Sequence, residues 1–98
     1  MNFEDKLKQC LKDANGVFEN IVWSTMRGQM LTLGTMTNDH VANSRHYHKH
    51  LAEVGRVAPE IYIDIEGCIF NQKLMERVID SRKVAGSWDI DQSDFRLE

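Results

Sequence analysis

Four histidines lie between positions 40 and 50, and imidazole is the side chain best suited to bind metal ions or exchange protons near neutral pH. His46, His48 and His50 alternate along the chain, and His40 precedes them. In a strand the alternating three would share one face. In a helix only His46 and His50 would, at the i and i+4 spacing that lets two imidazoles bind one metal ion. A complete metal site would take its other ligands from elsewhere in the chain or from a second chain. The alternative is a pair of solvated histidines.

Asp64 and Glu66 are separated by one isoleucine and follow an apolar residue. This short sequence resembles the first motif of exonucleases that hold two metal ions on a strand bearing Asp and Glu. Asp89 and Asp91 are the candidates to complete such a cluster. Together with the histidine pair, Asp64 and Glu66 would instead form the site of a metal-dependent hydrolase. We expect the simpler arrangement, an alternating strand whose carboxylates face solvent.

His40 and Asn43 stand three residues apart near the expected start of a helix. Helix N-termini attract anions, because their first N–H groups are unpaired and the helix dipole is positive there. With Arg45 and Tyr47, these residues are the candidate site for a small ligand such as a nucleotide signal, bound between two protomers. The structural alternative is that His40 only hydrogen-bonds nearby backbone groups.

Helical spacing of apolar residues predicts three helices that position these groups. They cover residues 2–14, residues 37–54 and residues 71–86. Caps are expected at Thr37 or Asn38 for the second helix and at Asn71 for the third. Each helix should end at a residue type that tolerates a left-handed conformation. These are Asn15 with Gly16, Gly55 and Gly86.

Strand propensity and alternation predict a hairpin and one or two further strands. The hairpin joins residues 18–25 to residues 30–33 through a turn in which Gly28 can take a positive φ. Residues 61–66 alternate apolar and polar side chains and form the clearest strand pattern. Residues 88–91 alternate too, and could add a strand to the same sheet; otherwise they form a surface for a partner.

These elements predict an α+β fold in which a small antiparallel sheet packs against two or three helices. A chain of 98 residues holds one core, so we expect a single compact domain over residues 1–98. Such a core is marginal, and a homodimer would stabilise it. The first 58 residues carry 7 Lys or Arg and 6 Asp or Glu, and the rest carry 5 and 9. This difference in charge could orient two copies.

The composition argues against several classes of protein. Hydrophobic residues make up 42%, as in an ordinary globular protein. The net charge is -3, so the chain lacks the basic surface of a nucleic-acid binder and we expect no direct nucleic-acid binding. No apolar run reaches about 18 residues, so we expect no membrane span. The acidic start has no signal-peptide core, and Cys10 and Cys68 are expected to be buried free thiols in a reducing cytoplasm. No cofactor is expected.

Residues 87–98 combine acidic and apolar side chains. Apolar area of this extent seldom stays in solvent, so the segment should either dock on the chain's own core or bind a partner. The residues predicted to contact a partner are Trp88, Asp89, Asp91, Asp94 and Phe95, with His46 and His50 second.

One stretch of the chain carries a recurring pattern. Its residues are Trp23, Thr25, Gly28, Leu31, Leu33, Met36, His40 and Asn43. The pattern resembles small phage-encoded accessory proteins of unknown function, in which a hairpin with a glycine turn leads into a helix bearing His and Asn. The resemblance implies a protein made in an infected bacterium. Such proteins often bind and block host machinery, so we expect a non-enzymatic inhibitor of a bacterial host protein, such as a defence component, in the host cytoplasm. Nucleotide-signal binding and the metal-dependent hydrolase are the alternatives.

Overall fold

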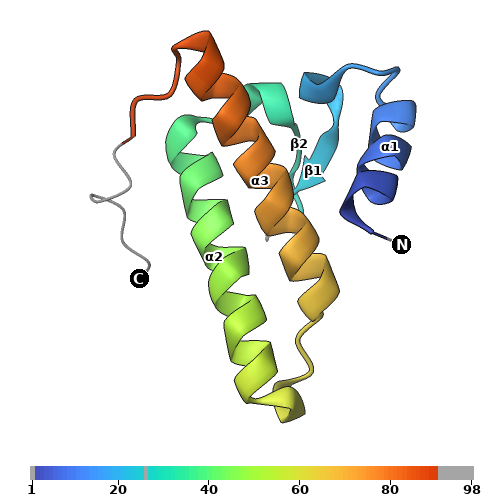
Figure 1. The fold of residues 1–98 in the computed structure, drawn as a ribbon, viewed down its shortest axis with the longest axis vertical. Helices are drawn as coiled ribbons and strands as arrows, with labels where there is room; N and C mark the ends of the chain where they lie inside the picture. The colour runs from blue at the N-terminus through green and yellow to red at the C-terminus, as the bar shows by residue number, and fades with distance from the viewer. Residues whose placement is uncertain (1, 26, 91–98) are drawn as a thin grey trace. The chain divides into compact units, whose positions relative to one another are not determined.

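The computed structural model describes residues 2–25 and 27–90 (Figure 1). Its main elements are, in chain order, the helix α1, the strands β1 and β2, and the helices α2 and α3, with short 3-10 turns between them. Three helices and an antiparallel pair of strands make the fold α+β, as predicted. Backbone contacts divide the chain after Thr37 into two compact units. That the whole chain forms one domain stays a prediction.

The first unit begins with α1, Phe3–Asp13. Asn2 caps this helix, because its side-chain Oδ1 accepts a hydrogen bond from the backbone N–H of Asp5 at 2.9 Å. The helix is followed by Asn15 and Gly16, which take positive φ angles of 55° and 79°. The predicted first helix and its stop are therefore confirmed.

The predicted hairpin is the second part of this unit. The strands β1, Val22–Ser24, and β2, Met30–Thr32, are antiparallel, with Trp23 opposite Leu31. In the connecting turn Gly28 has φ 81°, a conformation that glycine adopts without steric cost. Both strands are shorter than predicted, because the residues flanking them fold into 3-10 turns. The sheet has two strands in the described part of the chain.

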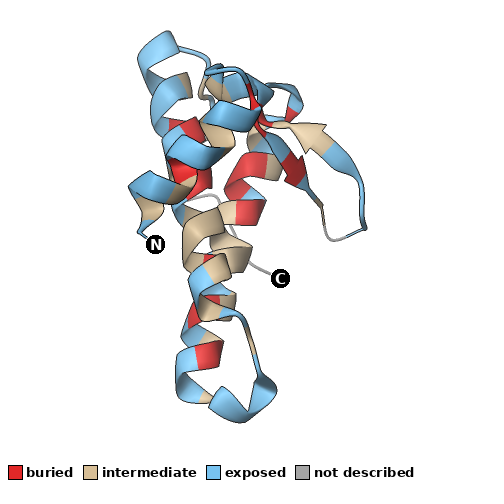
Figure 2. Ribbon diagram, turned by 90° about the vertical axis from the view of Figure 1, so that its right-hand side faces the viewer, coloured by how far each residue is buried: buried red, intermediate tan, exposed pale blue. Residues whose placement is uncertain are grey.

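The second unit is a helical hairpin of α2, Asn38–Val57, and α3, Ile65–Ala85. The two helices lie antiparallel and side by side (Figure 1). The largest side chains that are fully buried in this unit are those of Val41, Leu74 and Met75. Figure 2 shows buried positions along both helices and a mostly exposed end where the two helices are joined.

The helix α3 ends as predicted at Gly86, which has φ 76°. The backbone N–H of Ser87 donates to the Arg82 carbonyl at 2.9 Å, and that of Gly86 donates to the Lys83 carbonyl at 3.1 Å. These two bonds satisfy carbonyls that the helix end would leave unpaired, in the pattern of a Schellman motif. The chain therefore leaves α3 in a fixed direction.

The predicted strand over residues 61–66 is wrong. Pro59–Ile61 form a 3-10 turn, and α3 begins at Ile65. Asp64 is the N-cap of that helix, since its Oδ1 accepts a hydrogen bond from the N–H of Gly67 at 3.0 Å. The alternating isoleucines match a strand pattern, but the cap and the preceding proline determine the local structure.

Two predicted helix boundaries and one further strand are also wrong. Asn71 lies inside α3, which begins already at Ile65. Gly55 lies inside α2 and is buried. A Cβ at position 55 would stand 2.9 Å from Cγ1 of Ile65 and 3.2 Å from Cβ of Ile63, so glycine is needed there for the close approach of the connecting segment. Residues 88–90 form no strand, so the hairpin gains no third strand among the described residues.

Candidate partner-binding site

Asn38, the first residue of α2, anchors the chain where it leaves α3. Its Nδ2 donates hydrogen bonds to the Ser87 carbonyl at 2.8 Å and to Oδ1 of Asp89 at 2.7 Å. Arg82, in the last turn of α3, donates from Nη1 to Oδ1 of Asn38 at 2.7 Å. One side-chain amide therefore links the start of α2, the end of α3 and the segment that follows.

The helical hairpin brings these groups together. Because α2 and α3 are antiparallel, the start of one helix lies beside the end of the other, and the turn at Gly86 directs the chain across that end (Figure 1). Asp89 lies at the N-terminus of α2, where the helix dipole favours a carboxylate. Arg82 lies at the C-terminus of α3, where the dipole favours a cation.

Trp88 lies between the two residues that Asn38 holds and is partly buried. Its indole Nε1 is covered and has no hydrogen-bond partner within the described chain. A buried N–H without an acceptor costs about 1–3 kcal/mol. The bonds from Asn38 hold the backbone of Ser87 and the carboxylate of Asp89, so they fix the position of Trp88 without bonding its side chain.

Two of the predicted partner-binding residues, Trp88 and Asp89, fall within the described chain. The other three, Asp91, Asp94 and Phe95, lie outside the described residues. The sequence left two alternatives for the C-terminal segment, docking on the chain's own core or binding a partner. Because Asn38 bonds both Ser87 and Asp89, residues 87–89 are docked on the ends of the two helices. Asn38 was predicted only as a possible helix cap. Its partners Arg82 and Asp89 lie 44 and 51 positions away, so no local pattern identifies it as the anchor.

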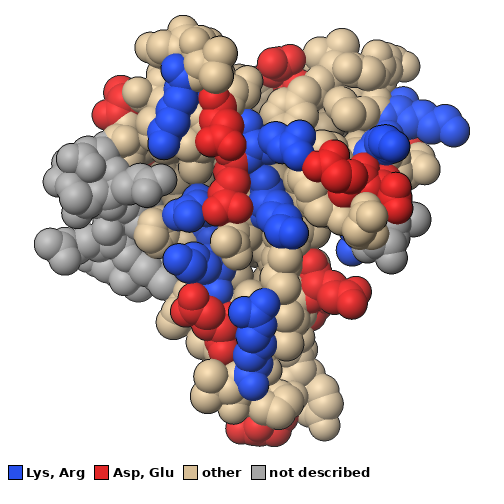
Figure 3. Space-filling view, viewed as in Figure 1, with Lys and Arg blue, Asp and Glu red and all other residues tan. Residues whose placement is uncertain are grey.

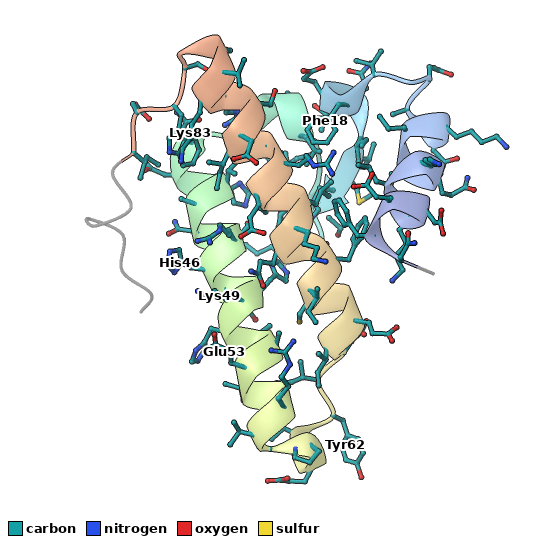
Figure 4. The ribbon with its side chains drawn as sticks, in the orientation of Figure 1. Phe18, His46, Lys49, Glu53, Tyr62 and Lys83 are labelled. Carbon is teal, nitrogen blue, oxygen red and sulfur yellow. The ribbon has the colours of Figure 1, made fainter. Side chains whose placement is uncertain are left out.

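His46 and His50 share one face of α2, as their spacing predicts. His46 is partly buried and His50 is exposed. Burial, and then the charges of Arg45 and Lys49, lower the pKa of His46, which favours its neutral form. Figure 4 shows His46, Lys49 and Glu53 on the side of α2 that points away from α3. Within the described chain, no three His, Cys, Asp or Glu side chains lie together as a metal site requires.

His48 lies on another side of α2. Its Nδ1 is 2.7 Å from the Ser44 carbonyl, and because a carbonyl only accepts, Nδ1 carries the proton. Burial lowers the pKa of His48, and the hydrogen bond to Ser44 opposes that shift without cancelling it. The ring also meets Tyr47 edge-on, with centroids 5.3 Å apart.

The four residues of the predicted ligand site lie on two faces of α2. His40, Asn43 and Tyr47 share one face, at positions i, i+3 and i+7. Arg45 lies on another face, where its Nε donates to Oε2 of Glu76 on α3 at 3.0 Å. That ion pair joins the two helices. On the face shown in Figure 3, Lys or Arg and Asp or Glu side chains are interleaved over α2 and α3.

Asp64 and Glu66 have structural positions at the start of α3. Asp64 is the cap, and Glu66 is exposed in the first turn, so the strand that suggested a two-metal site is absent. Both cysteines are free, as predicted, although Cys68 is buried and Cys10 only partly so. Burial, together with the nearby Asp64, raises the pKa of the Cys68 thiol, which makes it less nucleophilic at neutral pH.

No helix among the described residues combines the length and the apolar character needed to cross a membrane. The sequence matches no protein-family model and no curated protein, and the structure matches no solved structure.

Proposed function

We propose that this protein is a non-enzymatic accessory protein of phage type that binds and inhibits a bacterial host protein, with a component of a defence system as its target. It would act in the cytoplasm of the host cell. Two things support this proposal: the likeness of residues 23–43 to small phage proteins, and the arrangement of the segment that begins at Ser87. The observation that carries the proposal is the position of Trp88.

Trp88 combines a backbone that is held on both sides with a side-chain N–H that is not hydrogen-bonded within the described chain. Asn38 holds the residues on both sides of it, which reduces the conformational entropy that a partner must overcome. Within the described chain the indole N–H has no acceptor, so turning the side chain outward breaks no hydrogen bond there. A partner pocket that offers a carbonyl or carboxylate oxygen would satisfy this donor and bury the ring.

Asp89 adds a charged contact next to this anchor. It is exposed, and its Oδ1 accepts a hydrogen bond from Asn38. The second carboxylate oxygen leaves room for a cationic group of a partner. Trp is among the residues most enriched at the few positions that dominate binding energy, and a neighbouring charge adds to the specificity of the contact.

The test is a pull-down from bacterial lysate with the chain tagged at its N-terminus, followed by mass spectrometry and by an activity assay of the purified captured protein. The wild-type chain should retain one host protein in stoichiometric amount and inhibit it. Trp88→Ala should weaken that binding at least about 30-fold, the size expected when a hot-spot side chain is removed. Phe95→Ala should act in the same direction.

Met30→Ala is the matched control, because Met30 is apolar, 66% exposed and in the first unit. It should bind as the wild type does. If Trp88→Ala unfolds the chain, the exposed variant Asp89→Lys replaces it in the assay. Full binding by a folded Trp88→Ala variant, or a captured protein whose activity is unchanged, would overturn the proposal.

A further inference from the structure

The end of the helical hairpin where α2 and α3 are joined exposes apolar side chains. We call residues 56–66 the tip. Within it Val57 is 85% exposed, Ile61 55% and Tyr62 92%. Figure 4 shows Tyr62 at the end of the hairpin opposite to Lys83, and therefore remote from the segment that Asn38 anchors. Scattered exposed apolar residues are common, but three within six positions form a patch.

The stability of the chain does not explain why residue 62 is a tyrosine. Its φ is 59°, and among the described residues other than glycine only Asn15 also has a positive φ. Asparagine tolerates this conformation, whereas a bulky residue adopts it only at an energetic cost. Glycine would suit the backbone better, and the exposed ring contributes little packing. The tyrosine side chain therefore needs a reason outside this chain.

The backbone that carries Tyr62 is held firmly in place. The N–H of Tyr62 donates to the Pro59 carbonyl at 3.2 Å, and the N–H of Ile61 donates to the Ala58 carbonyl at 3.0 Å. On the inner side Ile63 approaches Gly55 of α2 closely. The ring is thus presented on an ordered turn, so a partner would not have to order the backbone when it binds.

The charges around the patch are mostly negative. Glu60, Asp64 and Glu66 are exposed carboxylates within the tip, and Arg56 is its one basic residue. A complementary partner would carry Lys or Arg around an apolar pocket. A second copy of this chain fits poorly, because two tips would bring the same carboxylates together.

The size of the patch also argues for a pocket. A tyrosine buries about 150–250 Å², so three side chains supply less than the roughly 800 Å² per partner that a stable flat interface buries. A projecting tip gains most area when it enters a concave surface. Tyrosine is also among the residues most enriched at the few positions that dominate binding energy.

We propose that the tip is a second docking surface, in which Tyr62, flanked by Val57 and Ile61, inserts into an apolar pocket with a basic rim on a partner protein. This surface does not depend on the contact proposed for Trp88. A protein with both surfaces can bridge two partners, or bind one large partner at two places.

The test uses the full chain with a photoreactive side chain at the tip. Tyr62→p-benzoylphenylalanine is irradiated in bacterial lysate, with Met30→p-benzoylphenylalanine as the control for non-specific labelling. The cross-linked protein is identified, its labelled peptide is mapped, and the purified partner is titrated by calorimetry with the wild type and with variants.

The expected result is one partner that is labelled only from position 62, at a pocket bordered by Lys or Arg. Tyr62→Asn keeps a residue that tolerates the positive φ, and it should weaken binding at least about 30-fold, as loss of a hot spot does. Glu60→Lys should weaken binding several-fold, and more at low salt. Asp80→Lys, an exposed acidic residue of α3 outside the tip, should bind as the wild type does.

Labelling of a second copy, labelling of lipid, the absence of labelling, or full binding by Tyr62→Asn would each overturn this proposal. Trp88→Ala in the same titration separates it from the proposed function. If Tyr62→Asn loses a partner that Trp88→Ala retains, the tip acts independently of the C-terminal segment. If only Trp88→Ala loses binding, the tip proposal fails while the proposed function stands.

Discussion

The two ends of the α2–α3 hairpin differ in the side chains that they present. The closed end, formed by Asn38, Arg82 and residues 87–89, is polar and hydrogen-bonded, and the tip is apolar and exposed. At one end, Asn38 and Arg82 form a set of hydrogen bonds that closes over the start of the C-terminal segment. At the other end the side chains of Ile63 and Ile65 leave no room for a Cβ at Gly55, while Val57 and Tyr62 remain exposed. At the closed end Asn38 and Arg82 form their hydrogen bonds within the chain, whereas the tip leaves its apolar side chains exposed.

Stability and partner binding should be coupled at the closed end and separable at the tip. At the closed end the same residues hold the chain and position Trp88, so a change there should affect both stability and partner binding. At the tip the inner residues support the turn and the outer residues face solvent. Changes to the inside of the tip should therefore lower stability, and changes to the outside should weaken binding without lowering stability.

The largest effect is expected from filling the space at Gly55. Gly55→Val would place side-chain atoms against Ile63 and Ile65, where even a Cβ stands 2.9 Å from Cγ1 of Ile65. Overpacking of this kind costs about 1–3 kcal/mol. Gly55→Ala should cost less, because alanine gains about 1 kcal/mol of helix propensity over glycine.

Chemical denaturation measures this effect, and Glu53→Val is the matched control. Glu53 is exposed on the same helix two positions earlier, so valine there should change the free energy of unfolding by only a few tenths of a kcal/mol. Equal stability of Gly55→Val and Glu53→Val would mean that the connecting segment does not pack on α2 at the tip.

Gly55 and Asp64 also show why local sequence patterns predict some elements and not others. The ends of α1 and α3 are fixed by residues next to them, Gly16 and Gly86 among these, and the pattern predicts them correctly. The role of Gly55 depends on contacts with Ile63 and Ile65, which follow only from the return of the chain. A helix-ending glycine and a close-packed glycine look the same in the sequence.

The strand prediction for residues 61–66 is wrong for a different reason. Period-two alternation of isoleucine is a strand pattern, but alternation over six residues is too short to exclude a turn followed by a helix. The cap formed by Asp64 with Gly67 was available in the sequence as an Asp before an apolar run. Of the candidate site, Trp88 and Asp89 were found from composition, whereas Asn38 and Arg82 required the antiparallel pairing of the helices.

At the closed end, Asn38→Ala should lower the free energy of unfolding by about 1–2 kcal/mol, because it removes the three bonds that this side chain makes. It should also loosen the segment that carries Trp88. The measurement is NMR of the two indole N–H signals, in which faster exchange with water is expected for Trp88 only. Asn43→Ala, exposed on the same helix, should change neither. Unchanged exchange at Trp88 in Asn38→Ala would show that other contacts hold the segment.

Acid should weaken the middle of the hairpin to a smaller degree. Burial lowers the pKa of His48 from the ordinary value of 6.5, so the unfolded chain binds more protons than the folded chain between the lowered pKa and 6.5. The stability that neutral His48 supports is therefore complete above pH 6.5 and is lost as the pH falls through the lowered pKa.

Thermal unfolding between pH 5 and pH 8 tests this assignment. His48→Gln should show a shallower loss of stability on acidification than the wild type. His50→Gln, exposed on the same helix, should keep the wild-type profile. Identical profiles for His48→Gln and the wild type would assign the acid sensitivity to other groups, of which His46 is the first to examine because its pKa is also lowered.

The smallest effect on stability, and the sharpest contrast between the ends, is expected at Tyr62. Tyr62→Gly removes a side chain that is 92% exposed and relieves a backbone held at φ 59°, so it should leave the free energy of unfolding unchanged or raise it by up to about 1 kcal/mol. Val84→Gly, also highly exposed but in a helical turn near the end of α3, should instead lower stability by several tenths of a kcal/mol. A clear loss of stability in Tyr62→Gly would mean that the ring supports the tip from within, and the tip would then resemble the closed end, where the same residues serve stability and binding. A variant that is at least as stable as the wild type and yet loses the cross-linked partner would show that this tyrosine serves a surface outside the chain.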